Sequence, residues 1–178
     1  DVTALNLRDL YLVEKPKDGE KFRQMKQKTP ARLGSGRAGP RYKPLTMLRF
    51  RADHAAAQDA VFSQVSEDFA RENGLLPLQT RCSNKDEYVT RPDWGRKLDE
   101  TSEKVLRAKA GQPGRVQIVV GDGLSSAAIT ANAMDCLAAF KDGLKLQGIE
   151  AAPDVFVRYC RVGAGDAIGD VTGCELVC

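Results

Sequence analysis

The sequence is 178 residues long, with 42% hydrophobic residues, 29% charged residues and a formal net charge of +3. This composition is typical of a globular protein with one domain, with or without a helical extension. No apolar run approaches the roughly 20 residues that a membrane-spanning helix needs, so we expect no membrane-spanning helix in this sequence.

The first residues and the cysteines indicate a reducing compartment. Residues 1–5 lack the basic and apolar regions of a secretory signal. The cysteines are odd in number and form no Cys-x-x-Cys pair, so we expect free thiols and a cytoplasmic location. His54 is the only histidine, and we expect no zinc site. The five cysteines are Cys82, Cys136, Cys160, Cys174 and Cys178.

Positive charge is concentrated in residues 15–43. This segment has ten Lys or Arg residues and two acidic residues, a net charge of +8, which leaves −5 for the rest of the chain. A basic front end on a mildly acidic body indicates that the front end meets something negative. We favour an interface with an acidic partner over a nucleic-acid arm, because only Tyr42 and Phe50 are nearby to stack on bases.

The first part of the chain predicts one short helix between irregular segments. Residues 1–16 are expected to be an extended arm. Residues 19–28 form a helix that ends before Pro30, because the residue preceding a proline resists helical dihedrals. Residues 33–43, which contain three glycines and a proline, are predicted to be a loop.

Two further helices are predicted next. Pro44 suits the first turn of a helix, and apolar residues then recur at helical spacing as far as Phe62, which predicts one apolar face. Ser66 is interpreted as the N-cap of a second helix, which ends at Gly74.

An edge strand and a third helix follow. We expect the strand over 75–82, at an edge because Pro77 cannot donate to a central ladder. Asp93 is interpreted as the cap of a helix over 94–110. Trp94, the only tryptophan, is flanked by arginines, which favours an interface or a domain seam over plain core.

After residue 112 the pattern changes to alternating strands and helices, which implies right-handed crossovers and a parallel sheet. We therefore predict an α/β fold, with an N-terminal arm and helical region over 1–112 and a Rossmann-like domain over 113–178. A buried parallel strand needs cover on both faces, so we expect the domain to continue beyond its last strand. The predicted strands are 116–120, 154–160 and 175–178, and the predicted helices are 125–146 and 164–172.

The Gly-Asp-Gly-Leu-Ser-Ser run at 121–126 follows a strand and opens a helix, the place where ligands bind in open α/β sheets. Two interpretations stay open. One is a tight turn in which Asp122 bonds its own backbone, and the other is a ligand-facing turn with Ser125 or Ser126 as a donor. A third glycine and a Walker lysine are absent, which argues against a stand-alone nucleotide binder.

Arg161 and Val162 leave the next strand at the same edge of the sheet. An arginine there can meet an amide or a phosphate, and a valine can cover an apolar ring; the alternative is a surface loop with a solvated arginine. The sequence shows no Ser/His/Asp or Cys/His arrangement and no evident pair of carboxylates. We therefore predict a binding surface and no catalytic residue in this chain.

From about residue 20 to its end, the chain resembles the small subunit of ethanolamine ammonia-lyase. The resemblance is spread over many short segments that occur in the same order. The matching segments are 36–41, 47–50, 52–54, 90–96, 121–126, 128–130, 143–145, 156–159 and 161–162.

The resemblance implies a lyase that uses adenosylcobalamin to convert ethanolamine to acetaldehyde and ammonia by radical chemistry. It implies a hetero-oligomer with a large TIM-barrel subunit, which carries the catalytic residues and shares the cofactor, and a bacterial microcompartment as the location. Val162, with Arg161 beside it, is the implied cofactor contact. No metal ligand, nucleic acid or membrane is expected; the alternative function is a nucleic-acid-binding module that uses residues 15–43.

Overall fold

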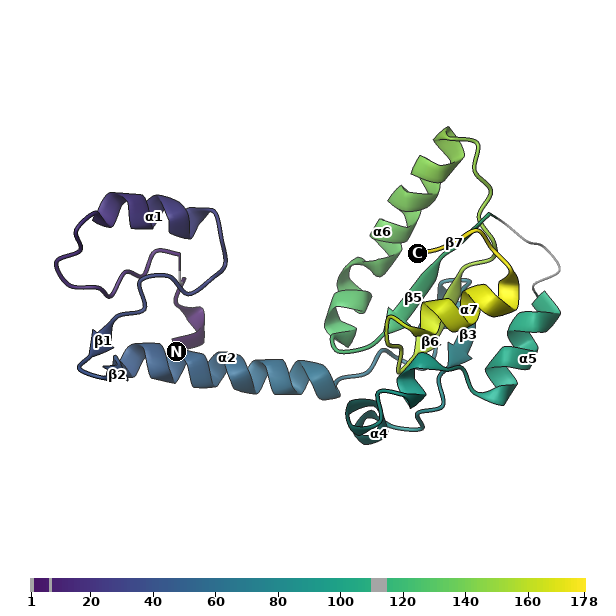
Figure 1. Cartoon of the computed structure of the whole chain (residues 1–178), viewed down its shortest axis with the longest axis horizontal. Helices are drawn as coiled ribbons and strands as arrows, with labels where there is room; N and C mark the ends of the chain where they lie inside the picture. The colour runs from purple at the N-terminus through teal and green to yellow at the C-terminus, as the bar shows by residue number, and fades with distance from the viewer. Residues whose placement is uncertain (1, 7, 110–114) are drawn as a thin grey trace. The chain divides into compact units, whose positions relative to one another are not determined.

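The computed structural model describes residues 2–6, 8–109 and 115–178 (Figure 1). The chain divides into two compact units, Asp1–Asp59 and Ala60–Cys178, which we call unit 1 and unit 2. The boundary that we expected between 112 and 113 lies outside the described residues. No helix in the described ranges has the length and apolar character to cross a membrane.

Unit 1 begins with a 3-10 turn, Val2–Ala4, and the helix α1, Gly19–Gln27. Asp18 caps α1 by accepting a hydrogen bond from the Lys21 amide at 3.1 Å, and the predicted helix is confirmed to within one residue. The predicted loop 33–43 instead contains a small antiparallel hairpin. Its glycine-proline turn lets two short strands pair, and the strands are β1, Arg37–Ala38, and β2, Arg41–Tyr42.

The helix α2 runs from Pro44 to Phe62, as predicted. Its apolar residues are not buried, however: none of its residues falls in the buried class, and Leu48 is 54% exposed. Within the described residues the predicted face therefore does not form a core. Phe50 stacks on His54, with ring centroids 6.4 Å apart, on the same exposed helix.

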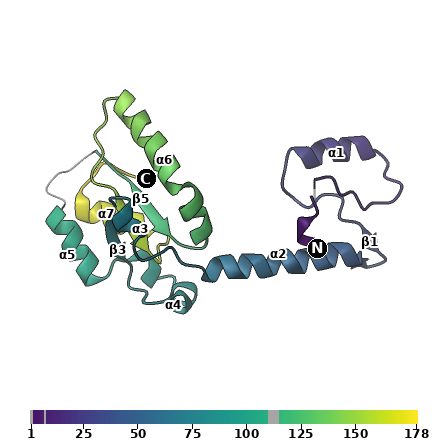
Figure 2. The same ribbon diagram turned by 180° about the vertical axis from the view of Figure 1, so that it is seen from behind.

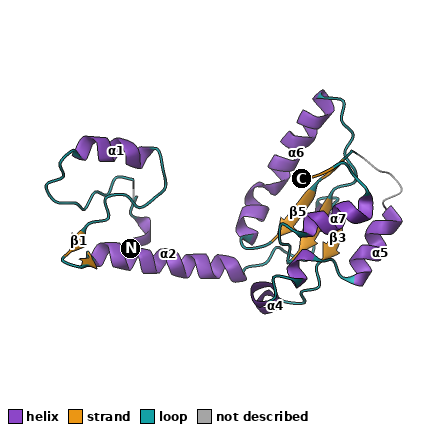
Figure 3. Cartoon of the chain, in the orientation of Figure 1, coloured by secondary structure: helices purple, strands orange, loops and turns teal. Residues whose placement is uncertain are grey.

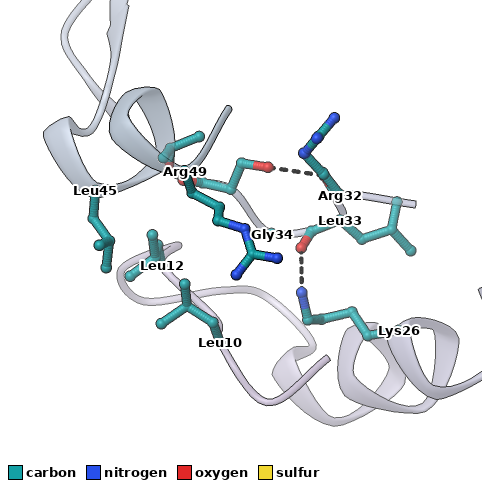
Figure 4. Close-up of a pocket in the computed structure, with 10 residues that line it drawn as sticks. Leu10, Leu12, Lys26, Arg32, Leu33, Gly34, Leu45 and Arg49 are labelled. Carbon is teal, nitrogen blue, oxygen red and sulfur yellow. Dashed lines mark hydrogen bonds between the residues drawn. The ribbon is translucent and has the colours of Figure 1, made fainter. Parts of the chain in front are cut away.

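Polar contacts hold the arm of unit 1 to α2. The Arg49 guanidinium donates to the carbonyls of residues 2, 3 and 5 at 2.7–2.9 Å, and its Nε donates to Asp53 at 2.8 Å. Asp53 also accepts from Arg32 at 2.8 Å. Figure 4 shows Lys26 and Arg49 directed into a small pocket of about 30 Å³, where the buried Lys26 donates to the Leu33 carbonyl at 2.6 Å. Burial lowers the pKa of Lys26.

Unit 2 is built on a parallel sheet, with helices on both sides (Figures 1 and 3). Its strands pair in the order β3–β6–β5, and β4 pairs with β7, all in parallel. Only Ile118 separates β4 from β5, so these two strands lie end to end and share one position in the sheet. The order of positions across the sheet is β3, then β6, then β4 with β5, then β7. The strands are β3, Leu76–Gln79; β4, Val116–Gln117; β5, Val119–Asp122; β6, Val155–Arg158; and β7, Leu176–Val177.

The parallel sheet predicted after residue 112 is confirmed, and it gains a strand from before that point. β3 lies at the edge of the three-stranded part, where Pro77 is tolerated because its missing amide proton breaks no central ladder. The edge strand expected over 75–82 is thus confirmed as β3, and it joins this sheet although it precedes residue 113.

Two apolar cores lie on opposite faces of this sheet. Side chains alternate along a strand, so Phe156 packs with Leu137 of α6, whereas Val155 and Val157 pack with Ile168 of α7. Figure 2 shows the same unit from behind. The helices are α6, Ser126–Leu146, and α7, Ala164–Thr172, together with α5, Glu100–Lys109, on the α7 side.

Two predicted helices are corrected. The helix expected over 66–74 shrinks to α3, Phe69–Glu72. The helix expected over 94–110 is split into a 3-10 turn, Trp94–Arg96, and α5. The segment between them is extended, because Leu98 is buried in the core and bridges Thr80 next to β3.

Candidate functional site

The candidate site is the point where β5 and β6 end side by side. The two strands are parallel neighbours, with Asp122 opposite Arg158 at their carboxyl ends. The chain leaves β5 for α6 on one face and leaves β6 for α7 on the other face. Such a divergence opens a crevice at the carboxyl edge of the sheet, which is the usual ligand position in open α/β folds.

The turn after β5, residues 121–126, is shaped by a buried carboxylate. Asp122 is fully buried and accepts hydrogen bonds from the Val65 amide at 3.2 Å and the Ser126 hydroxyl at 2.7 Å. Asp122 therefore shapes a tight turn, as the first of our two interpretations predicted. Its carboxylate does so through Val65 and Ser126 instead of its own backbone. Leu124 and Ser125 remain exposed at the tip of the turn.

Glycines let the two turns touch. A Cβ at Gly121 would lie 2.8 Å from the Cys160 sulfur, and a Cβ at Gly123 would lie 2.9 Å from the Cys160 carbonyl oxygen. The Cys160 amide donates to the Asp122 carbonyl at 2.9 Å. The Gly-x-Gly spacing thus provides close backbone approach between the turns.

The turn after β6 projects Val162 into solvent. Tyr159 has a φ of 55°, a left-handed conformation that a bulky side chain rarely adopts, and it ends the strand. Three residues later, Val162 is 98% exposed, so this valine forms no part of the core of the described chain. An aliphatic side chain held in this position is available to a partner or a ligand.

Arg161 is turned inward. Its guanidinium donates to the Tyr88 carbonyl at 2.7 Å and lies 4.7 Å from the centre of the Tyr88 ring. Its Nε is buried and has no hydrogen-bond partner among the described residues. The structure therefore brings Arg161 and Val162 to the predicted edge, but only Val162 presents its whole side chain outward.

A short helix, α4, Lys85–Thr90, contacts both turns and was not predicted from the sequence. Asn84 caps α4 by accepting from the Glu87 amide at 2.9 Å, and Glu87 accepts from the Ser83 amide at 2.8 Å. The Asn-x-x-Glu pattern at 84–87 resembles a capping box and could have revealed the helix. No local signal pointed to its contacts with the turns.

A cavity of about 400 Å³ adjoins the site, lined by residues of β5, α7 and β7 and by Cys160 and Val162. Burial raises the pKa of the Cys160 thiol to about 11, and the negative charge of Asp122 adds to this rise. The thiol is therefore neutral at physiological pH and is not a nucleophile there. Across the described residues no group of three potential ligands could hold a metal ion.

Trp94 lies beside the site but faces the core. It is half-buried against the cluster of Cys82, Tyr88 and Tyr159, and the Arg91 guanidinium lies 4.1 Å above its ring. Asp93 does not cap a helix; its carboxylate pairs with Arg91 at 2.9 Å. Packing thus accounts for Trp94, and the interface that we favoured for it stays a prediction.

Comparison with known proteins identifies the family. The family described as ethanolamine ammonia-lyase light chain matches residues 19–178. Proteins named ethanolamine ammonia-lyase small subunit are 53% identical in Clostridium perfringens, 55% in Clostridioides difficile and 52% in Listeria monocytogenes, each over all 178 residues of this chain. The chain spans 60–61% of the length of these relatives. It belongs to the ethanolamine ammonia-lyase light-chain family.

Proposed function

We propose that this chain acts as the small subunit of ethanolamine ammonia-lyase and helps to bind adenosylcobalamin at the β5–β6 edge. The reaction is the deamination of ethanolamine to acetaldehyde and ammonia, and the partner is a large TIM-barrel subunit that carries the catalytic residues. Adenosylcobalamin, when bound, supplies the radical chemistry. The family membership supports this function, and we extend it to a cytoplasmic location within a bacterial microcompartment.

The observation that carries the proposal is the exposure of Val162 at the crevice. A corrin ring is a broad, largely apolar plate with a polar rim, and it needs a flat apolar contact at its face. Val162 offers one at 98% exposure, and Gly121 and Gly165 line the cavity beside it without side chains to obstruct the ring. The residues present therefore fit a planar, apolar group better than a phosphate, since Arg161 is engaged by Tyr88.

In this proposal the residues of this chain hold and orient the cofactor. Val162 covers the ring and excludes water from it, and the buried Asp122 holds the neighbouring turn in place. The neutral Cys160 thiol lines the cavity without adding a charge. Such a surface orients a cofactor and leaves proton transfer to other residues.

We propose that unit 1 also contacts the large subunit. Leu48 and Phe50 are exposed on α2, and the basic segment 15–43 lies in the same unit. Several of its cations are paired within the chain: Arg32 with Asp53, Lys43 with Glu14 and Lys21 with Asp18. An exposed apolar surface with partly paired charge suits a protein interface better than a phosphate backbone.

The test is Val162→Asp in the small subunit, assembled with the large subunit. A carboxylate buried against the ring loses an apolar contact and must be desolvated, so we expect cobalamin affinity to fall by about 100-fold or more. Leu146→Asp is the matched control, because Leu146 is 85% exposed at the far end of α6. Equilibrium dialysis measures affinity, and sedimentation velocity checks assembly. Unchanged affinity in Val162→Asp contradicts the proposed contact.

A further inference from the structure

The helix α4 makes contacts with both turns of the site. Lys85 donates from its Nζ to the Gly123 carbonyl in the turn after β5. Tyr88 donates from its hydroxyl to the Cys160 carbonyl in the turn after β6, at 3.3 Å. The carbonyl of Tyr88 in turn accepts from Arg161 at 2.7 Å. One short helix is therefore bonded to the backbone of both ligand-facing loops.

These two side chains cannot contact a ligand themselves. Lys85 is 4% exposed and Tyr88 is 3% exposed. A buried ammonium group is costly, and an apolar side chain of similar length would fill the same space without that cost. The amine is therefore explained by what it binds, which is the Gly123 carbonyl and the face of the Tyr88 ring, whose centre is 5.2 Å away.

Three groups meet at Gly123, so the turns have little freedom to move apart. A Cβ at this position would lie 2.9 Å from the Cys160 carbonyl oxygen and 3.0 Å from the Tyr88 hydroxyl. The tips of the two turns, Leu124 and Val162, are exposed aliphatic side chains. The contacts from α4 fix the backbone from which both tips project.

We propose that Lys85 and Tyr88 are positioning residues that set the spacing of Leu124 and Val162, so that both side chains contact the corrin ring together. This inference rests on the proposed function. A rigid, flat ligand is bound most tightly by contacts that are already in place, because no free energy is then spent on ordering the turns. Losing either bond from α4 lets one turn shift and misaligns one of the two tips.

The experiment uses Lys85→Met and Tyr88→Phe in the small subunit, assembled with the large subunit, and cyanocobalamin as the probe. Both variants keep a side chain of similar size. Tyr88→Phe removes only the hydroxyl donor, and Lys85→Met removes the amine donor together with its positive charge. We expect each to weaken equilibrium binding by about 5- to 10-fold. Val89→Ala, at an exposed position of the same helix, should leave binding unchanged.

Two readouts separate positioning from general stability. In the cofactor-free complex, hydrogen exchange of residues 123–125 should rise in Lys85→Met and that of residues 160–162 should rise in Tyr88→Phe, while the exchange of α6 stays unchanged. In a double-mutant cycle, the effect of Tyr88→Phe should shrink in a Val162→Ala background, because the tip that it positions is gone.

The outcomes distinguish this inference from the proposed function. If Val162→Ala weakens binding and Tyr88→Phe and Lys85→Met do not, the role of α4 is overturned and the site stands. If the effects of Tyr88→Phe and Val162→Ala add independently, the positioning role is likewise overturned. If Val162→Ala leaves binding unchanged, the contact and the inference both fail.

Discussion

Replacing Asp122 by alanine tests whether its buried carboxylate organises the site. Asp122 accepts from the Val65 amide at 3.2 Å and lies 2.7 Å from the Ser126 hydroxyl, which is also 2.8 Å from the Ser63 carbonyl. The hydroxyl has one proton and can keep Ser63 as its acceptor, so alanine leaves one buried donor, the Val65 amide, without a partner.

The cost follows from that count. A hydrogen bond to a charged group contributes about 1.5–3 kcal/mol, and an unpaired buried amide costs about 1–3 kcal/mol. We therefore expect Asp122→Ala to lower the free energy of unfolding of unit 2 by about 3 kcal/mol. Asp122→Asn should cost about 1 kcal/mol or less, because its amide oxygen can accept from Val65 while its NH₂ group donates to Ser126.

Urea unfolding of the full chain, followed by the fluorescence of the single tryptophan, measures both values, since Trp94 lies in unit 2. With a slope of about 1.5 kcal/mol/M, alanine shifts the midpoint down by about 2 M and asparagine by well under 1 M. Equal losses in the two variants would show that the charge matters rather than the hydrogen bonds. A loss below about 0.5 kcal/mol in alanine would refute the role of Asp122.

Three further predictions concern a thiol, an ion pair and the core. Cys160, with its pKa raised to about 11, should resist iodoacetamide at pH 8 while the exposed thiols react; labelling at equal rates contradicts the burial. The hydrogen bond from Arg32 lowers the pKa of Asp53, so the stability that Asp53 contributes is present above its ordinary pKa of 3.8 and is lost as the pH falls. At neutral pH, Asp53→Asn should therefore speed hydrogen exchange in residues 2–6, whereas Asp59→Asn should not. Ile168→Ala removes a fully buried side chain and should cost about 3 kcal/mol, a fall in Tm of about 10 °C; a fall below about 2 °C excludes α7 from the core.

Elements with strong local signals were predicted well. Pro44 begins α2 as expected. Gly173, with a φ of 67°, ends α7 in the left-handed conformation that favours glycine. These features depend on residues within one turn of each other, and that is the range over which a sequence pattern can be read directly.

Elements that depend on distant partners were predicted poorly. Helical propensity continues through 97–99, yet the burial of Leu98 and its bridge to Thr80 extend the backbone there. The apolar spacing of α2 predicted an apolar face, but no α2 residue in the described part of the chain is buried, and Leu48 is 54% exposed. Periodicity shows which face of a helix is apolar and does not show what covers it.

The residues of the candidate site likewise include some that the sequence could place and others that it could not. The two turns, with Val162 and the glycines at 121 and 123, could be placed at one edge of the sheet from the order of strands and helices alone. The inward turn of Arg161 and the contacts of α4 with the turns could not, because Lys85 and Gly123 are far apart in the sequence and meet only after the sheet has formed.

By itself the sequence determined the family, the alternation of strands and helices after residue 112, and the edge of the sheet at which the turns 121–126 and 161–163 lie. It did so because turns, caps and parallel crossovers are encoded in short runs of residues. Only the tertiary structure decided which side chains face outward at that edge. Burial and hydrogen bonding between distant segments leave Val162 exposed and place Asp122, Lys85 and Tyr88 behind it.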